Sequence, residues 1–107
     1  MKRYGMVIGL KPGKLKEYRD YHDNIWPEIL RVIERCNIRN YTIFHRNNQL
    51  FSYFEYFGNN FKQDMEIMAA DEKTKEWWSI MGPMQVPEQD REQGEWWATM
   101  EEVFHND

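Results

Sequence analysis

Tyr18 and His22 are the residues of this chain whose types and spacing are best suited to proton transfer. They are four residues apart, so a helix places them one above the other on a single face. An imidazole titrates near neutral pH and can both accept and donate a proton, and a neighbouring tyrosine hydroxyl can orient a hydroxyl of a bound molecule. The alternative interpretation is that both side chains simply pack against a sheet, and the pair alone does not decide between the two.

Two pairs of adjacent tryptophans, Trp77-Trp78 and Trp96-Trp97, are the second notable feature. An indole face stacks well on the C–H face of a sugar, and the indole N–H can donate a hydrogen bond to a hydroxyl. Neighbouring residues on a helix diverge by about 100°, so only one of Trp77 and Trp78 can point fully into a given pocket. Core filling and burial at an interface remain the alternative explanation for both pairs.

Other kinds of active site find little support in the sequence. The three histidines (His22, His45 and His105) are far apart and lack zinc-type spacing. Neither a glycine-rich phosphate loop, a dinucleotide fingerprint nor a serine hydrolase motif is present. Cys36 follows an apolar helix face and is predicted to be buried. We therefore expect neither a metal nor a cofactor.

The elements that must position these residues begin with a strand at Tyr4–Leu10. Apolar residues then recur at helical spacing from Leu15 to Ile33. Pro12 is suited to the first turn of this helix. Pro27 either kinks one helix or begins a second one that Asp23 or Asn24 would cap. Asn37 is a suitable helix stop.

The second half of the chain predicts a hairpin, two short helices and a last strand. The expected strands, Tyr41–Arg46 and Leu50–Phe57, are joined by Asn47-Asn48-Gln49. The turn Gly58-Asn59-Asn60 offers a cap for the next helix, and Asp71 can cap the helix that carries Trp77 and Trp78, which Gly82-Pro83 would end. Residues 83–94 are predicted to form an ordered loop, and residues 97–104 the last strand.

This order, β-α-β-β-α-β, predicts an α+β fold of the ferredoxin-like type, a four-stranded antiparallel sheet with helices on one face. One helical layer leaves the other sheet face open, and the aromatic strands would expose too much apolar surface there. That face is therefore expected to form a ligand cup, to be covered by a second subunit, or both.

Composition limits the classes of partner. The 107 residues fit one domain spanning 1–107, and the formal charge of −4 argues against nucleic acid or an anionic membrane. No apolar stretch approaches membrane-spanning length, and the N-terminal apolar run is too short for a signal peptide. A single cysteine fits a reducing compartment, so a cytoplasmic protein is expected.

The segment Glu17-Tyr18, His22 and Ile25-Trp26-Pro27-Glu28 resembles the signature of the L-rhamnose mutarotase family. The similarity continues to the C-terminus and covers nearly the whole chain in order. The combination of His22, Ile-Trp-Pro-Glu and a later Trp-Trp is far more specific than any one part. The other matching motifs are Asn40-Tyr41-Thr42-Ile43, Phe54-Glu55, Trp77-Trp78 and Glu101-Glu102-Val103-Phe104. Trp96 and Trp97 lie outside the resemblance.

The resemblance implies a homodimeric α+β barrel that interconverts the α and β anomers of L-rhamnose without metal or cofactor. It implies that His22 is the acid/base residue and that Tyr18, Tyr41, Trp77 and Trp78 contact the sugar. L-Fucose or another 6-deoxy sugar is the alternative substrate. Two other classes remain as alternatives: a cofactor-independent monooxygenase or haem-degrading enzyme, and a non-catalytic sugar-binding module.

Overall fold

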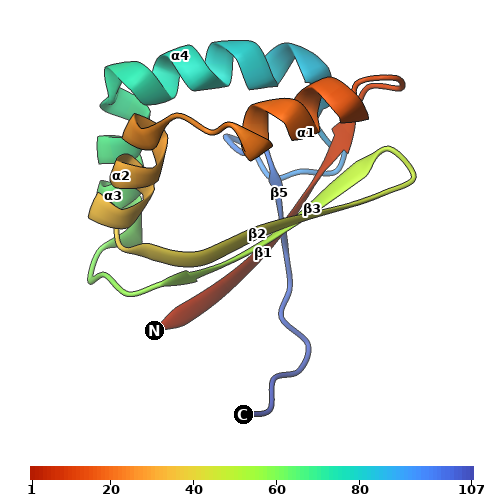
Figure 1. Ribbon diagram of the computed structural model, residues 1–107. Coiled ribbons are helices and arrows are strands. Elements are labelled where there is room, and N and C mark those ends of the chain that lie inside the picture. The colour runs from red at the N-terminus through yellow and green to blue at the C-terminus, as the bar shows by residue number, and fades with distance from the viewer.

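The computed structural model describes all 107 residues and forms an antiparallel sheet with four α-helices on one face (Figure 1). No helix is both long enough and apolar enough to cross a membrane. The elements in chain order are β1 (Lys2–Leu10), α1 (Leu15–Asp23), α2 (Pro27–Arg35), β2 (Ile38–Arg46), β3 (Gln49–Tyr56), α3 (Phe61–Ala70), α4 (Glu72–Met81), the 3-10 helix η1 (Gly82–Met84), β4 (Gln85–Val86) and β5 (Ala98–Met100).

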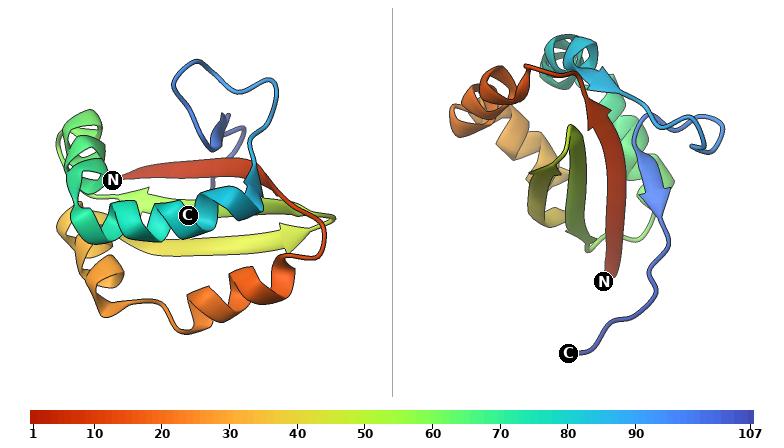
Figure 2. Two further views of the ribbon diagram at one scale, coloured as in Figure 1. Left: turned by 90° about the horizontal axis from the view of Figure 1, so that it is seen from above. Right: turned by 90° about the vertical axis from the view of Figure 1, so that its right-hand side faces the viewer.

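The sheet is centred on β1 and β3, which pair antiparallel over almost their whole length. The strand order is β2-β3-β1-β4, and β5 also pairs with β1. The two short strands share one edge of β1, with β4 opposite Gly9 and Leu10 and β5 opposite the segment Gly5 to Val7. The two further views in Figure 2 show the helical layer on one side and the C-terminal strand at the β1 edge. The predicted α+β class with an antiparallel sheet is confirmed.

Two expectations for the C-terminal part are wrong. The segment 83–94 is not entirely a loop, because Gln85–Val86 forms β4. The last strand is shorter than 97–104, since only Ala98–Met100 is paired and residues 101–107 have no regular structure. β5 pairs only with the segment Gly5 to Val7, and the residues after Met100 leave the edge of β1 instead of continuing along Lys2 to Tyr4.

The helical stretch after β1 is divided into two helices by Pro27, which stands at the start of α2. A proline lacks the N–H that would be unpaired there anyway, so it begins a helix without penalty. The expected caps are wrong: the N-cap is Trp26, and Asn24 instead closes α1 through an amide hydrogen bond to the carbonyl of Asp20. Pro12 also lies outside the helix, because the turn at Gly13 delays the start of α1 to Leu15.

The hairpin and the later caps follow the prediction closely. Asn47 and Asn48 both have positive φ, 50° and 59°, as the two central residues of a type I′ turn require. Asn60 caps α3 by accepting from the N–H of Gln63, and Asp71 caps α4 by accepting from the N–H of Thr74. Asn37, the expected helix stop, has a left-handed φ of 66° just after α2.

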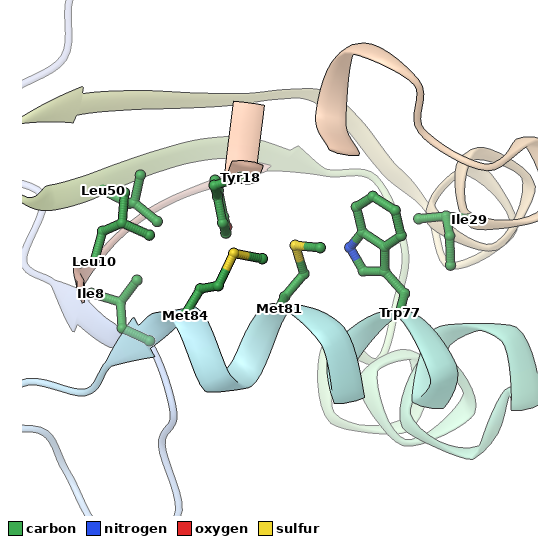
Figure 3. Packing of buried hydrophobic residues seen from close by; sticks show 8 residues of the cluster. All are labelled: Ile8, Leu10, Tyr18, Ile29, Leu50, Trp77, Met81 and Met84. Atoms are coloured by element: carbon green, nitrogen blue, oxygen red, sulfur yellow. The ribbon is translucent and has the colours of Figure 1, made fainter. Parts of the chain in front are cut away.

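The core lies between the sheet and the helices because alternate residues of β1 and β3 point to the helical layer. Ile8 is paired with Leu50, and both side chains are buried. Figure 3 shows Trp77, Met81 and Met84 projecting from α4 and η1 toward Tyr18, Ile29 and the strands. A second buried cluster includes Cys36, whose burial was predicted.

We expect Leu50→Ala to lower the free energy of unfolding by about 2–5 kcal/mol, because it removes a side chain that is 1% exposed and leaves a cavity opposite Ile8. The matched control is Leu30→Ala on α2, where the leucine is 51% exposed and the change should fall within about 0.5 kcal/mol of wild type. Urea unfolding of both variants measures the difference. Equal losses would contradict this description of the core.

Candidate active site

The structure places Tyr18 and His22 together on α1, as their spacing predicts. Their rings lie 4.4 Å apart between centroids. His22 Nδ1 lies 2.8 Å from the backbone carbonyl oxygen of Tyr18. A carbonyl oxygen can only accept, so Nδ1 carries a proton and donates. In the neutral imidazole the unprotonated nitrogen is therefore Nε2, which makes no hydrogen bond within the protein.

Trp77 completes one side of this pair. It lies edge-on to His22, with ring centroids 5.3 Å apart, and edge-on to Trp26 at 5.1 Å. Trp78 diverges from it as a helical neighbour must, is 47% exposed and makes no aromatic contact with the cluster. The structure therefore brings Trp77, and not Trp78, to His22.

Tyr41 reaches the helical side of the sheet from β2. A bulge between Arg39 and Thr42, with Asn40 at a φ of 54°, interrupts the register beside it. Its ring lies 5.5 Å from that of Phe54. The residue is 40% exposed, yet burial of its hydroxyl raises the pKa, and the nearby Tyr18 raises the same pKa further. Tyr41 therefore lies close enough to Tyr18 for its own pKa to be affected.

Burial determines the protonation of the cluster. It lowers the pKa of His22 below the ordinary value of 6.5, against opposing contributions from the Tyr18 carbonyl and from Asp23. Burial also raises the pKa of Tyr18 to about 12, against a hydrogen bond from Gln85. At neutral pH the cluster therefore offers a neutral imidazole with a free Nε2 beside a protonated phenol. This is a suitable pair for general base catalysis and hydrogen-bond donation.

Gln85 is a residue that sequence reasoning missed. Its side chain is buried, and its amide lies 3.1 Å from the Tyr18 hydroxyl and 2.8 Å from Nε1 of Trp96. No sequence signal pointed to it, because it lies in a segment predicted to be a loop. Trp97 is partly buried and packs against the core.

Two open surface depressions lie away from Tyr18 and His22, although Trp26 lines one of them. One lies over α1 and the other beside β4, and neither is lined by Tyr18, His22 or Tyr41. Each is wide open to solvent, so neither excludes water as a proton-transfer site should. We place the candidate site at the buried titratable pair rather than at these depressions.

Sequence comparison decides the family. The L-rhamnose mutarotase family matches residues 3–106. The chain belongs to the L-rhamnose mutarotase family. Relatives of this mutarotase-family chain include the L-rhamnose mutarotase of Oceanobacillus iheyensis, which is 32% identical over the full length of both chains. The L-rhamnose mutarotase of Bacillus subtilis is 30% identical, with 78% of this chain and 80% of the relative covered.

Solved structures agree with this family assignment. The crystal structure of an L-rhamnose mutarotase from Formosa agariphila is similar with a TM-score of 0.80 and 25% identity, and the match covers both chains completely. Tetracenomycin F2 cyclase from Streptomyces glaucescens is similar with a TM-score of 0.71 at 14% identity, covering all of this chain and 98% of the cyclase. At that identity the second likeness concerns the fold alone.

We expect the His22 imidazole to titrate below pH 6.5 in the folded protein, because burial disfavours its charged form. The unfolded chain, with a pKa of about 6.5, then binds more protons in the interval between the two values. The free energy of unfolding should therefore decrease as the pH falls from about 6.5 through the folded pKa. NMR titration of the imidazole nitrogens measures the pKa and the Nδ1–H tautomer. His22→Asn should lack this part of the pH dependence, and a folded pKa above 6.5 would contradict the expectation.

Proposed function

We propose that this protein interconverts the α and β anomers of L-rhamnose, with His22 as the residue that moves the proton. The observation that carries the assignment of His22 is its fixed tautomer, with Nδ1–H held by the Tyr18 carbonyl and Nε2 left as a free base in a partly buried aromatic setting. Family membership supports the reaction and favours it over a monooxygenase or a non-catalytic sugar-binding module.

The reaction needs a proton to leave the anomeric hydroxyl and a proton to reach the ring oxygen. Neutral His22 accepts the proton of the anomeric hydroxyl at Nε2, and the resulting imidazolium delivers it to the ring oxygen as the ring opens. The open aldehyde turns about the C1–C2 bond, and the same steps in reverse close the ring on the other carbonyl face. One group whose pKa lies near the working pH is sufficient for both directions.

The neighbouring side chains bind and orient the sugar in this scheme. Tyr18 and Tyr41 hold sugar hydroxyls, and burial raises the pKa of each phenol above its ordinary value of about 10, so both stay protonated well above neutral pH. Trp77 forms an aromatic wall beside His22, which suits the C5 methyl group of L-rhamnose. Trp78 lies on the exposed side of α4, and in this proposal it contacts the sugar from the solvent side of the site. L-Fucose and other 6-deoxy sugars carry the same methyl group and are the alternative substrates.

We also infer that two copies pair through the sheet face that no helix covers, as in a dimeric α+β barrel of ferredoxin-like subunits. In Figure 1 the four helices lie on the other side of the sheet. The uncovered face carries Phe44, Val86 and Met100, all exposed, next to the half-buried Phe51 and Tyr53. Such a contiguous apolar patch is costly in water, and pairing of identical faces about a twofold axis would bury it.

His22→Asn should lower the rate of anomer exchange by about 10²-fold or more while the protein stays folded and binds L-rhamnose. Asparagine retains a polar side chain but cannot carry a proton at any useful pH. Saturation-transfer NMR of L-rhamnose measures the exchange, and a thermal midpoint on the same preparation reports the fold. The control is His105→Asn in the exposed C-terminal segment, which should exchange at the wild-type rate. Wild-type exchange by a folded His22→Asn protein would remove His22 from the mechanism.

Light scattering at micromolar concentration should give the mass of a dimer for the wild type and of a monomer for Phe44→Glu. Phe44 is 64% exposed on the uncovered face, so a buried carboxylate there would oppose pairing. Ile67→Glu, a change of an exposed apolar residue on α3, is the control and should remain dimeric. A wild type that is only monomeric would refute the inference.

A further inference from the structure

A chain of two hydrogen bonds leads from the C-terminal loop to the candidate site. Trp96 Nε1 lies 2.8 Å from Gln85 Oε1, and Gln85 Nε2 lies 3.1 Å from the hydroxyl oxygen of Tyr18. Gln85 is 7% exposed and belongs to β4, which pairs with the end of β1. The chain therefore connects Trp96 to α1 through a side chain that has little freedom to move.

The direction of both hydrogen bonds follows from the groups at the ends. An indole N–H can only donate, so the Gln85 amide must turn its oxygen to Trp96 and its NH₂ to Tyr18. An amide NH₂ can only donate, so the Tyr18 oxygen must accept. The Tyr18 hydroxyl has a single proton, and Gln85 does not use it. The hydroxyl makes no other hydrogen bond in the protein.

We propose that Gln85, oriented by Trp96, is a positioning residue that keeps the Tyr18 hydroxyl proton free to bind a sugar oxygen. The inference rests on the proposed function and specifies the role of Tyr18 in it: Tyr18 donates to an accepting oxygen of the sugar. In this arrangement Tyr41, which is 40% exposed and whose pKa is raised in part by the nearby Tyr18, would make the second hydroxyl contact.

Two further features support this direction of the hydrogen bonds. The pKa of Tyr18 is raised to about 12, so the hydroxyl retains its proton across the whole neutral range. Gln85 is uncharged, so its orientation does not change with pH and depends only on the Trp96 N–H. A glutamine that only filled space would not need a donor on its oxygen and an acceptor on its NH₂.

Gln85→Glu reverses the hydrogen bond while keeping the size of the side chain. An ionised carboxylate can only accept, so it still satisfies Trp96 but takes the Tyr18 proton away from the sugar. We expect the dissociation constant for L-rhamnose to rise by about 3- to 10-fold, the scale of one neutral hydrogen bond. The exchange rate at saturating sugar should change little, because His22 is untouched.

A double-mutant cycle separates this role from a purely structural one. Tyr18→Phe removes the hydroxyl, so adding Gln85→Glu to it should weaken L-rhamnose binding no further. Intrinsic tryptophan fluorescence or calorimetry with L-rhamnose measures all four affinities. Additive losses, or a folded Gln85→Glu protein with wild-type affinity, would overturn the proposal. If the wild type binds L-rhamnose without exchanging its anomers, the proposed function fails. The cycle still tests whether the Tyr18 hydroxyl donates its proton to the sugar.

Trp96→Phe provides the second variant, needed if Gln85→Glu does not fold. It keeps an aromatic ring at a half-exposed position and removes only the N–H that orients the amide. The amide can then rotate and accept from Tyr18, so L-rhamnose affinity should fall by about 2- to 5-fold. Trp97→Phe, which removes an indole N–H that makes no hydrogen bond in the protein, is the comparison for the loss of an indole N–H. Unchanged affinity of Trp96→Phe would overturn the inference.

Discussion

The edge-on packing of Trp77 against His22 and Trp26 joins the two halves of the helical layer. Trp77 comes from α4, late in the chain, whereas His22 lies in the last turn of α1 and Trp26 precedes α2. Aromatic rings prefer such edge-to-face contacts, and their large buried area makes the junction strongly favourable. The distance between α1 and α4, and hence the place of the titratable pair between them, depends on this junction.

The same burial determines the chemistry of the cluster. A partly buried imidazole is more easily kept neutral, and a buried phenol keeps its proton. Each buried polar side-chain atom has a hydrogen-bond partner. Two groups with only one possible role set the directions of these hydrogen bonds. The Trp96 N–H can only donate, which orients Gln85, and the Tyr18 carbonyl can only accept, which fixes the tautomer of His22. Packing therefore fixes protonation and hydrogen-bond direction together. As a result, His22 presents an unprotonated Nε2, and Tyr18 presents a hydroxyl proton that no protein group accepts.

The two faces of the sheet have different roles in this arrangement. The helical face holds Ile8 and Leu50 in the core and receives Tyr41 from β2. The opposite face carries exposed apolar side chains and is the surface through which we infer pairing. The edge of β1 has a third role, because its division between β4 and β5 brings Gln85 to Tyr18.

The sequence by itself determined those features that depend on local physical chemistry. Proline at the start of α2, paired asparagines in the hairpin turn, side-chain caps at Asn60 and Asp71, and the shared face of Tyr18 and His22 all follow from contacts within a few residues. Motif resemblance identified the family. Only the tertiary structure decided that Trp77 rather than Trp78 meets His22, that β4 exists, and that Gln85 joins Trp96 to Tyr18. The Gln85–Tyr18 contact joins residues 67 positions apart, and β4 forms only because β1 offers a free edge, so neither leaves a periodic signal in the chain.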